Sequence, residues 1–517
     1  MAAPSNLFVL VKSLTRSEKR YFTIFNAGQG GEDTNYLRLF EFLDKMHKYD
    51  KEEIQEAFAE EFEAKKFHVL QNYLYTLILR ALRAYNDGKD IEANIQNMIQ
   101  EADLLEKRGM YKQSAEHLNL ARRKAEKYEK TYLLLAIKRR ELSFTAFRNE
   151  ALMVERIDEI SKDLDELIQK ITLEHIAMMT YYKIGTLSRK ATRISQEQLD
   201  SLKSKWQQEI SLLGKTNLPF TGKYFRFLTD AYLAKFSGNY QEFSDLLFEV
   251  VKIWSDHPHH IKDQPHRFRI YLSNYLDSLH GLGDFSHSQA IIEILEGRKP
   301  SIPFAFSKEL SGVIKSLKFL EPRNFNEEGE FFQSIAFLKL FFYLNTKNWG
   351  LAQKEIEWIE KGMSTYKEKI NRARELVLYY LISLVYFMLD DTDRALHWLL
   401  KIINQSRNDH RRDLQRFAPF LQLMFFIDQG LYELARDKTN DLRRRMKRKD
   451  DVSTFEKLIL DHLKGDIFAH HTKKVQKKAF EAFAKDLHDF KVQQNGVFTL
   501  GLDETEIWIE KNIKKLL

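Results

Sequence analysis

The sequence predicts an all-α fold, a right-handed α-solenoid of antiparallel helical hairpins with a distinct helical N-terminal cap. Three observations support this prediction. The chain has 517 residues but only 20 Gly and 8 Pro, too few chain breakers for a turn-rich all-β protein or a disordered chain. Apolar residues recur at the i, i+3, i+4 spacing of amphipathic helices, and the period-two alternation of strands is almost absent. One frame of large, small and turn residues also recurs along the chain.

Composition removes several kinds of chemistry. With no Cys, the sequence excludes disulfides, thiolate zinc sites, iron–sulfur clusters and cysteine nucleophiles. The formal net charge of +7 resolves into local basic clusters rather than a uniformly basic sequence. The hydrophobic fraction of 44% is ample for cores in a chain whose length indicates more than one structural unit.

The sequence predicts neither export nor a membrane span. The N-terminus lacks a basic segment, and its apolar run, 7–11, is too short for a signal peptide. The most apolar stretch, 376–389, falls short of the roughly 18 to 20 residues that cross a bilayer, and two aspartates follow it directly. We therefore expect a buried helix here and a cytoplasmic protein.

Residues 1–90 are predicted to form a separate helical cap, because they do not follow the recurrent frame. Capping boxes mark helix starts at Thr15 and Asp50. Further helices are expected over 36–46 and over the basic amphipathic stretch 65–85. Such a cap covers the apolar end of a helical stack that would otherwise face water.

The frame occupies the predicted repeat region, 91–450. Its first copy has a large, a small and a large residue, then Gly-x-aromatic at a turn, then a small, a large and a small residue on a second helix. The residues of this copy are Met98, Ala102, Leu105, Gly109, Tyr111, Ser114, Leu118 and Ala121. Small residues let two antiparallel helices approach closely, and the glycine relieves a turn where φ is positive. The aromatic residue is expected to fill the space where the next hairpin stacks.

Five further copies follow. Their turn positions hold Gly238, Gly283, Lys347, Asp390 and Gly430. Three of the intervals between copies are roughly 40 to 45 residues, and the longer intervals leave room for degenerate copies or an insertion.

The order of residues in the frame resembles the tetratricopeptide (TPR) pattern, although the standard repeat has about 34 residues. The resemblance implies a TPR-like right-handed α-solenoid of degenerate repeats that binds protein partners. The alternative is a set of unrelated helical hairpins that share Gly-x-aromatic turns.

Residues 451–517 are predicted to form a C-terminal helical cap. Ser453 and Asp503 each begin a capping box. The last helix, 504–517, carries Ile507, Trp508 and Ile513, which need a surface on which to pack.

A candidate partner groove lies on the inner face that the resemblance implies, where the first helix of each hairpin lines the concave surface. The residues at the inward positions of two neighbouring repeats are aromatic or aliphatic, namely Phe337, Phe341, Tyr380, Leu384 and Phe387. Such a groove favours an amphipathic helix or peptide of a protein partner. The alternative is that these residues are buried, because helices that are apolar all round commonly belong to a core.

A second candidate site is a basic cluster. It comprises Arg411, Arg412, Arg443, Arg444, Arg445 and Lys447. If these side chains converge, they form a phosphate-binding surface for nucleic acid, with an affinity that falls steeply with salt. The alternative is a solvated helix face opposite an apolar stripe. The basic helix over 65–85 presents the same two alternatives.

No sequence motif indicates catalysis. The tripeptide Gly214-Lys215-Thr216 has the tail of a phosphate-binding loop, but it lacks the upstream glycine and a preceding strand. Four histidines around Pro258 are of a type that ligates transition metals, but their setting favours a solvated loop. They are His257, His259, His260 and His266. We therefore expect no metal, no cofactor and no catalytic residue.

These features predict a non-catalytic helical-repeat scaffold or adaptor that mediates protein–protein interaction in the cytoplasm. The alternative is a nucleic-acid-binding helical-repeat protein that uses the C-terminal and N-terminal basic helices. The sequence does not identify the partner, because one solenoid architecture serves many partners.

Overall fold

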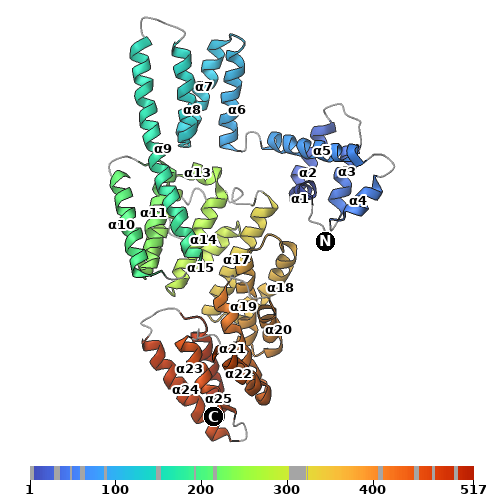
Figure 1. The fold of residues 1–517 in the computed structure, drawn as a ribbon, viewed down its shortest axis with the longest axis vertical. Coiled ribbons are helices and arrows are strands. Elements are labelled where there is room, and N and C mark those ends of the chain that lie inside the picture. The colour runs from blue at the N-terminus through green and yellow to red at the C-terminus, as the bar shows by residue number, and fades with distance from the viewer. Residues whose placement is uncertain are drawn as a thin grey trace. The chain divides into compact units, whose positions relative to one another are not determined.

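The computed structural model describes most of the chain (Figure 1). The described residues are 5–27, 35–46, 49–58, 64–86, 90–146, 153–190, 194–213, 218–301, 322, 324–405, 411–447, 453–468, 472–493 and 499–517. They form α-helices and one short 3₁₀ helix, and no strand occurs among them. The chain divides into two compact units, Met1–Glu328 and Gly329–Leu517. The predicted all-α class is therefore confirmed, whereas the handedness of a solenoid stays a prediction.

The first five helices of the N-terminal unit share a core of their own. They are α1 (Asn6–Ser13), α2 (Arg16–Ala27), α3 (Asn35–Lys45), α4 (Lys51–Ala57) and α5 (Ala64–Tyr85). Val11, Leu39 and Ile78 are fully buried in this core. The predicted capping box at Thr15 is confirmed, because the Thr15 amide donates to Glu18 Oε2 over 2.8 Å and the Glu18 amide donates to Thr15 Oγ1 over 3.2 Å.

The rest of the N-terminal unit consists of helices that pack in neighbouring pairs. They are α6 (Ile91–Glu106), α7 (Tyr111–Lys127), α8 (Thr131–Ala146), α9 (Met153–Lys190), α10 (Gln196–Leu213), α11 (Phe220–Phe236), α12 (Tyr240–Asp256), α13 (Pro258–Asp263), α14 (Pro265–Gly281) and α15 (Ser288–Leu295). Helix α6 packs on α7, and α11 packs on α12. Helix α9 has 38 residues, so it packs on α8 with one part and on α11 with another (Figure 1).

Helix α17 (Phe325–Asn345) begins at the end of the N-terminal unit and continues into the C-terminal unit. The later elements are α18 (Trp349–Thr365), α19 (Arg372–Met388), α20 (Thr392–Ile403), α21 (Arg412–Asp428), α22 (Tyr432–Lys447), α23 (Thr454–His462), the 3₁₀ helix η2 (Gly465–Phe468), α24 (Lys473–Gln493) and α25 (Leu502–Lys515). The apolar stretch that predicted a buried helix lies in α19, where Leu376, Ile382 and Val385 are fully buried. None of the helices in the described ranges combines the length and the apolarity that a membrane span requires.

The frame found in the sequence marks one recurrent turn geometry. The backbone angle φ is positive at all six turn positions, which are Gly109 (75°), Gly238 (76°), Gly283 (74°), Lys347 (59°), Asp390 (62°) and Gly430 (74°). This left-handed region favours glycine, because an L side chain there lies too close to the following carbonyl. The frame therefore locates the same turn even where lysine or aspartate replaces glycine.

Each of these turns ends the preceding helix with the same pair of hydrogen bonds. The amide after the turn residue donates to the carbonyl five residues earlier, as from Met110 to Leu105 over 3.0 Å and from Asp391 to Tyr386 over 2.9 Å. The amide of the turn residue itself donates to the carbonyl three residues earlier. This pattern is the Schellman motif, which satisfies carbonyls that a helix end otherwise leaves without partners. Helices α6, α11, α14, α17, α19 and α21 end in this way.

Small residues bring the two helices of a pair together across the turn, as the frame predicts. Ser114 Oγ donates to the carbonyl of Ala102 over 2.8 Å, and Ser383 Oγ donates to the carbonyl of Ala395 over 2.8 Å. The two pairs occupy the same frame positions with the serine on opposite helices, and all four residues are fully buried. A larger side chain at these positions would separate the helices, because the interior is close-packed.

The predicted role of the aromatic turn residue is wrong for Tyr111 and Tyr240. Their side chains remain 46% and 48% exposed, so they do not fill a space between hairpins. Each is the first residue of its helix, α7 or α12, where the helix end leaves the ring in solvent.

The three predicted domains, 1–90, 91–450 and 451–517, stay a prediction. The division between the compact units falls inside the predicted repeat region. The segments next to the two predicted boundaries, 87–89 and 448–452, lie outside the described residues.

The turn geometry predicts opposite effects for two substitutions in the C-terminal unit. Lys347→Gly should raise the free energy of unfolding by about 0.5 to 1 kcal/mol, because glycine adopts positive φ without strain. Gly430→Ala should lower it by about 1 kcal/mol, since alanine is strained there. Urea unfolding followed by circular dichroism measures both changes.

Two features make this comparison specific for φ. A Cβ at Gly430 would lie 4.0 Å from Tyr432, which is an ordinary contact, so no clash contributes. Gly350 is the control, because a Cβ there meets nothing within 4 Å and its φ is not in the left-handed region. If Gly350→Ala destabilises the protein as much as Gly430→Ala, the role assigned to φ is wrong.

Candidate functional site

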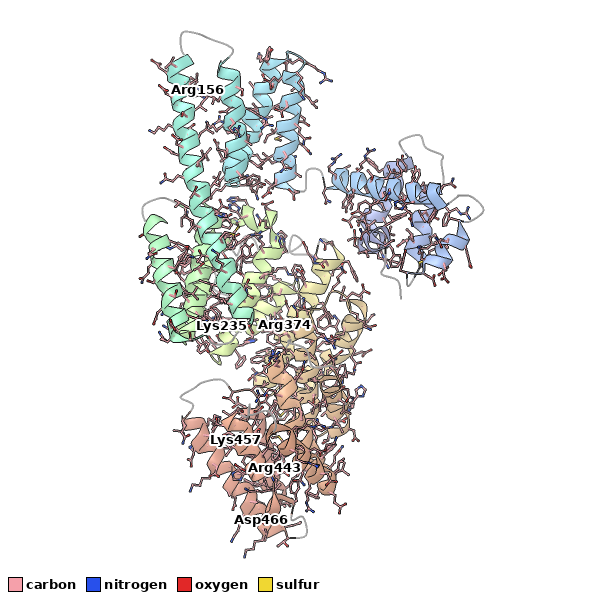
Figure 2. The ribbon with its side chains drawn as sticks, viewed as in Figure 1. Arg156, Lys235, Arg374, Arg443, Lys457 and Asp466 are labelled. Atoms are coloured by element: carbon pink, nitrogen blue, oxygen red, sulfur yellow. The ribbon has the colours of Figure 1, made fainter. Side chains whose placement is uncertain are left out.

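The five residues of the predicted partner groove belong to one hydrophobic cluster in the C-terminal unit. Tyr380, Leu384 and Phe387 of α19 are 3%, 5% and 1% exposed, so a partner cannot reach them in this conformation. Phe337 and Phe341 of α17 are partly buried against the same cluster. Arg374 of α19 lies over the Phe337 ring, 4.1 Å from its centroid (Figure 2). The structure thus brings the five residues together but closes the α19 part of the face, and their role in binding stays a prediction.

Helix α25 contacts α19 and the turn that follows it through side chains. Tyr380 Oη donates to Glu504 Oε1 at the start of α25 over 2.8 Å. About two turns further along both helices, Lys511 Nζ lies 4.8 Å from the centroid of the Phe387 ring. Lys511 also forms an ion pair with Asp390. Because both contacts advance in the same direction, α25 runs parallel to α19.

Helix α25 also packs on α21. Trp508 Nε1 and Asn512 Nδ2 both donate to Asp428 Oδ1, each over 3.0 Å. Gly501, the N-cap of α25, has a φ of 88°, and a Cβ added there would lie 2.1 Å from the Phe417 ring. Glycine therefore allows the helix start to approach α21. The surface that receives α25, hereafter the α25 seat, comprises Tyr380, Phe387, Asp390, Phe417 and Asp428.

Helix α24 contacts α25 on another side. The rings of Phe480 and Trp508 meet edge to face, with centroids 5.2 Å apart. Lys491 Nζ of α24 lies 2.6 Å from Glu506 Oε2 of α25. Ile507 and Lys514 of α25 are exposed. Helix α25 is thus amphipathic and is held by α19, α21 and α24.

Two carboxyl groups are partly buried where α25 meets its neighbours, Glu504 of α25 and Asp428 of α21. Burial raises the pKa of Glu504 and of Asp428, because the charged form loses water. The donors Tyr380, Trp508 and Asn512 act in the opposite direction by stabilising the charged forms. Asp428 Oδ2 is buried and has no hydrogen-bond partner among the described residues. The seat therefore holds α25 through directional polar contacts and leaves one carboxylate oxygen unsatisfied.

Internal contacts engage several residues of the predicted basic cluster. Arg411 forms a bidentate ion pair with Asp413 over 2.9 and 2.7 Å. Arg443 donates to the carbonyl of Leu460 (Figure 2). Arg444 pairs with the aspartate one turn earlier on α22. The Arg444 side chain nevertheless stays 73% exposed, so its pair leaves the guanidinium group open to solvent.

The other members of the basic cluster leave the nucleic-acid alternative as a prediction. Arg412 is the first residue of α21, and Arg445 is exposed near the end of α22. The side chain of Lys447 lies outside the described residues.

The interpretation of the histidine cluster as a solvated loop is wrong. Residues Pro258–Asp263 form α13, with proline at its first position. His260 is 2% exposed, and its ring stacks on Phe220 with centroids 3.8 Å apart. Burial, together with the neighbouring His259, lowers the pKa of His260 to about 3. In the described ranges, no group of three or more His, Cys, Asp or Glu residues is placed to hold a metal ion.

A buried ion network lies beside α13, and no sequence pattern predicts it. Lys130 Nζ lies 2.9 Å from Asp263 Oδ2 and 2.9 Å from Glu92 Oε1, and Lys130 is 6% exposed. The partners are far apart along the chain, so no local motif joins them. A buried lysine needs such paired carboxylates, and the network therefore ties α6 and α13 to the turn before α8.

The tripeptide Gly214-Lys215-Thr216 lies outside the described residues.

Comparison with protein-family models, with curated proteins and with solved structures finds no match for this chain. The resemblance to tetratricopeptide proteins accordingly rests on the recurrent frame. The all-helical architecture, the six shared turns and the burial of Tyr380, Leu384 and Phe387 are the observations from which a function can be inferred.

The hydrogen bonds to Asp428 predict how the stability of the protein depends on an acceptor in the α25 seat. Asp428→Asn keeps an acceptor for Trp508 and Asn512 and removes a buried charge, so the melting temperature at pH 7 should stay unchanged or rise. Asp428→Leu should lower the free energy of unfolding by about 2 to 3 kcal/mol, because both donors lose their acceptor. Thermal unfolding at pH 7 compares the two variants, and an equal loss in both would contradict this role of Asp428.

His260 predicts a loss of stability in acid. Its pKa in the folded chain, about 3, lies below the ordinary value of 6.5, so the unfolded chain binds a proton first. The stability that neutral His260 contributes is fully present above pH 6.5 and decreases as the pH falls toward 3. His260→Phe keeps a ring against Phe220 and should flatten the free energy of unfolding against pH between 6.5 and 4.

Urea unfolding at a series of pH values measures this slope. His488, which is exposed on α24, supplies the control, and His488→Phe should leave the slope as in the wild type. An unchanged slope in His260→Phe would show that His260 does not contribute to the acid sensitivity.

Proposed function

We propose that this protein is a non-catalytic helical-repeat scaffold or adaptor of the cytoplasm, built as a TPR-like right-handed α-solenoid, that binds a protein partner. The observation that carries the proposal is the path of α25 along α19 and α21. Those helices precede a frame turn, so they correspond to the first helices that line the inner face in the resemblance. An amphipathic helix on this face is the mode of recognition that the sequence predicted.

The recurrent turn is a second observation that supports the proposal. Because six helices end with the same cap, the residues at a given distance before the turn occupy equivalent places on successive helices. Aromatic and aliphatic residues at such places on α17 and α19 share one cluster, as Phe337 and Tyr380 do. A row of equivalent apolar positions is suited to a long helical ligand rather than to a small molecule.

The contact of Arg443 with a backbone carbonyl and the bidentate pair of Arg411 favour a protein partner over nucleic acid, because these guanidinium groups already have acceptors. Nucleic-acid binding therefore enters the test below as a competing outcome. Arg445, which is exposed, is a residue through which it would act.

Site-specific photo-crosslinking in the full chain tests the proposed function. A benzophenone amino acid replaces Phe337, which is partly buried on the face, or Leu351, which is 47% exposed on α18. We expect one protein to be captured at about equal stoichiometry from position 337 and not from position 351, because only the former lies on the proposed face.

Two outcomes would contradict the proposal. One is the absence of any stoichiometric protein adduct at position 337 in lysate of the source cells. The other is capture that disappears after nuclease treatment, which would assign the surface to nucleic acid instead.

A further inference from the structure

Helix α25 has the properties of a ligand as well as those of a structural element. It is amphipathic, and it lies on the face proposed for a partner helix. Its buried residues, Trp508 and Ile509, are at most 1% exposed, whereas Ile507 beside them is 40% exposed. One side of α25 is thus shaped to the α25 seat.

The polar contacts of α25 define a pattern that the α25 seat recognises. Glu504, Trp508 and Asn512 follow each other at steps of four residues, so they lie on one side of the helix. Each has a partner in the seat, with Tyr380 for the carboxylate and Asp428 for the two donors. Such contacts fix the direction and the register of a bound helix, which apolar packing alone does not.

We propose that the α25 seat is the docking site for an amphipathic helix of the protein partner, and that α25 occupies this site until the partner displaces it. The inference rests on the proposed function and specifies the partner. The partner helix carries a carboxylate in its first turn, a tryptophan one turn later, and a lysine and an amide donor one turn beyond. The acids Asp390 and Asp428 select for the lysine and for the donors by charge complementarity.

Three features of the seat make α25 an exchangeable occupant. Asp428 Oδ2 is buried without a hydrogen-bond partner among the described residues, so α25 does not use the whole seat. The seat also retains the partly buried carboxyl group of Asp428, whose loss of water lowers the net gain from covering it at neutral pH. In addition, α25 follows α24 closely in the chain, and a tethered segment has an effective concentration of the order of millimolar. The tether therefore keeps α25 bound even where its intrinsic affinity for the seat is modest.

Competition within the chain sets how tightly a partner helix binds. The apparent affinity equals the intrinsic affinity multiplied by the fraction of molecules in which the seat is open. A substitution that weakens α25 but leaves the seat intact should therefore strengthen the binding of a helix from outside. Lys511 suits this purpose, because it contacts Asp390 and Phe387 from the α25 side.

Fluorescence anisotropy with a labelled synthetic peptide of residues 499–517 tests the inference on the full chain. The Lys511→Ala chain should bind the peptide about 5- to 10-fold more tightly than the wild-type chain, because its own α25 loses an ion pair and a cation–π contact. Lys514→Ala is the matched control on the exposed side of α25, and its affinity should stay within about twofold of the wild type.

Two further variants locate the binding. Asp428→Leu combined with Lys511→Ala should weaken peptide binding at least about tenfold, since the seat loses its central acceptor. The double variant has a risk of misfolding. A peptide with Trp508→Ala is therefore also tested for binding to the Lys511→Ala chain, so that the change lies in the peptide and not in the protein. This peptide should also lose at least about tenfold in affinity.

Several outcomes would overturn the inference. They are absence of peptide binding to the Lys511→Ala chain, equal peptide binding to the wild-type chain and to all its variants, and binding that does not depend on Trp508 of the peptide. A wild-type chain that forms a concentration-dependent dimer, which the peptide dissociates, would assign the seat to α25 of a second copy. If the peptide does not bind while crosslinking at position 337 still captures a protein, the proposed function stands and only the assignment of this docking site is wrong.

Discussion

A left-handed turn after the first helix of six described pairs is the constraint on which the repeated packing depends. The Schellman hydrogen bonds end the helix at a defined residue, and the positive φ sends the chain back toward the same helix. The turn thereby sets the register between the two helices. This register explains why the buried pair of Ala102 with Ser114 recurs as Ser383 with Ala395. The turn needs no glycine, as Lys347 and Asp390 show, although glycine relieves the strain.

The C-terminal unit combines this repeated geometry with one element that lies across it. Helix α25 brings polar groups into an apolar face, where Tyr380 meets Glu504 and Asp428 receives Trp508 and Asn512. Burial of the two carboxyl groups opposes the gain from covering aromatic residues, so the net stability of this contact is smaller than its area suggests. A contact of this kind specifies direction and register, which is the property that the proposed partner site requires.

Several charged side chains in the described part of the chain are satisfied by internal contacts. The buried Lys130 is satisfied by two carboxylates, and Arg443 by a backbone carbonyl. His260 carries no buried charge, because its ring stays neutral in the stack with Phe220. The net charge of +7 therefore says little about partners, because the solvent-exposed fraction of the basic residues, rather than their number, determines attraction to phosphate.

The all-α class, the recurrent turn and the small residues at the helix contacts are local properties, and the sequence alone predicts them because backbone sterics act within a few residues. The sequence also identified Phe337 and Tyr380 as related positions and Trp508 as a residue in need of a surface. It did not reveal that Trp508 lies on the same face as Tyr380, because that pairing joins distant segments whose contact depends on the path of the whole chain. The same reason hid the Lys130 network and the burial of His260. Local periodicity reports which side of a helix is apolar, whereas the partner that covers it is selected by packing between helices far apart in the chain.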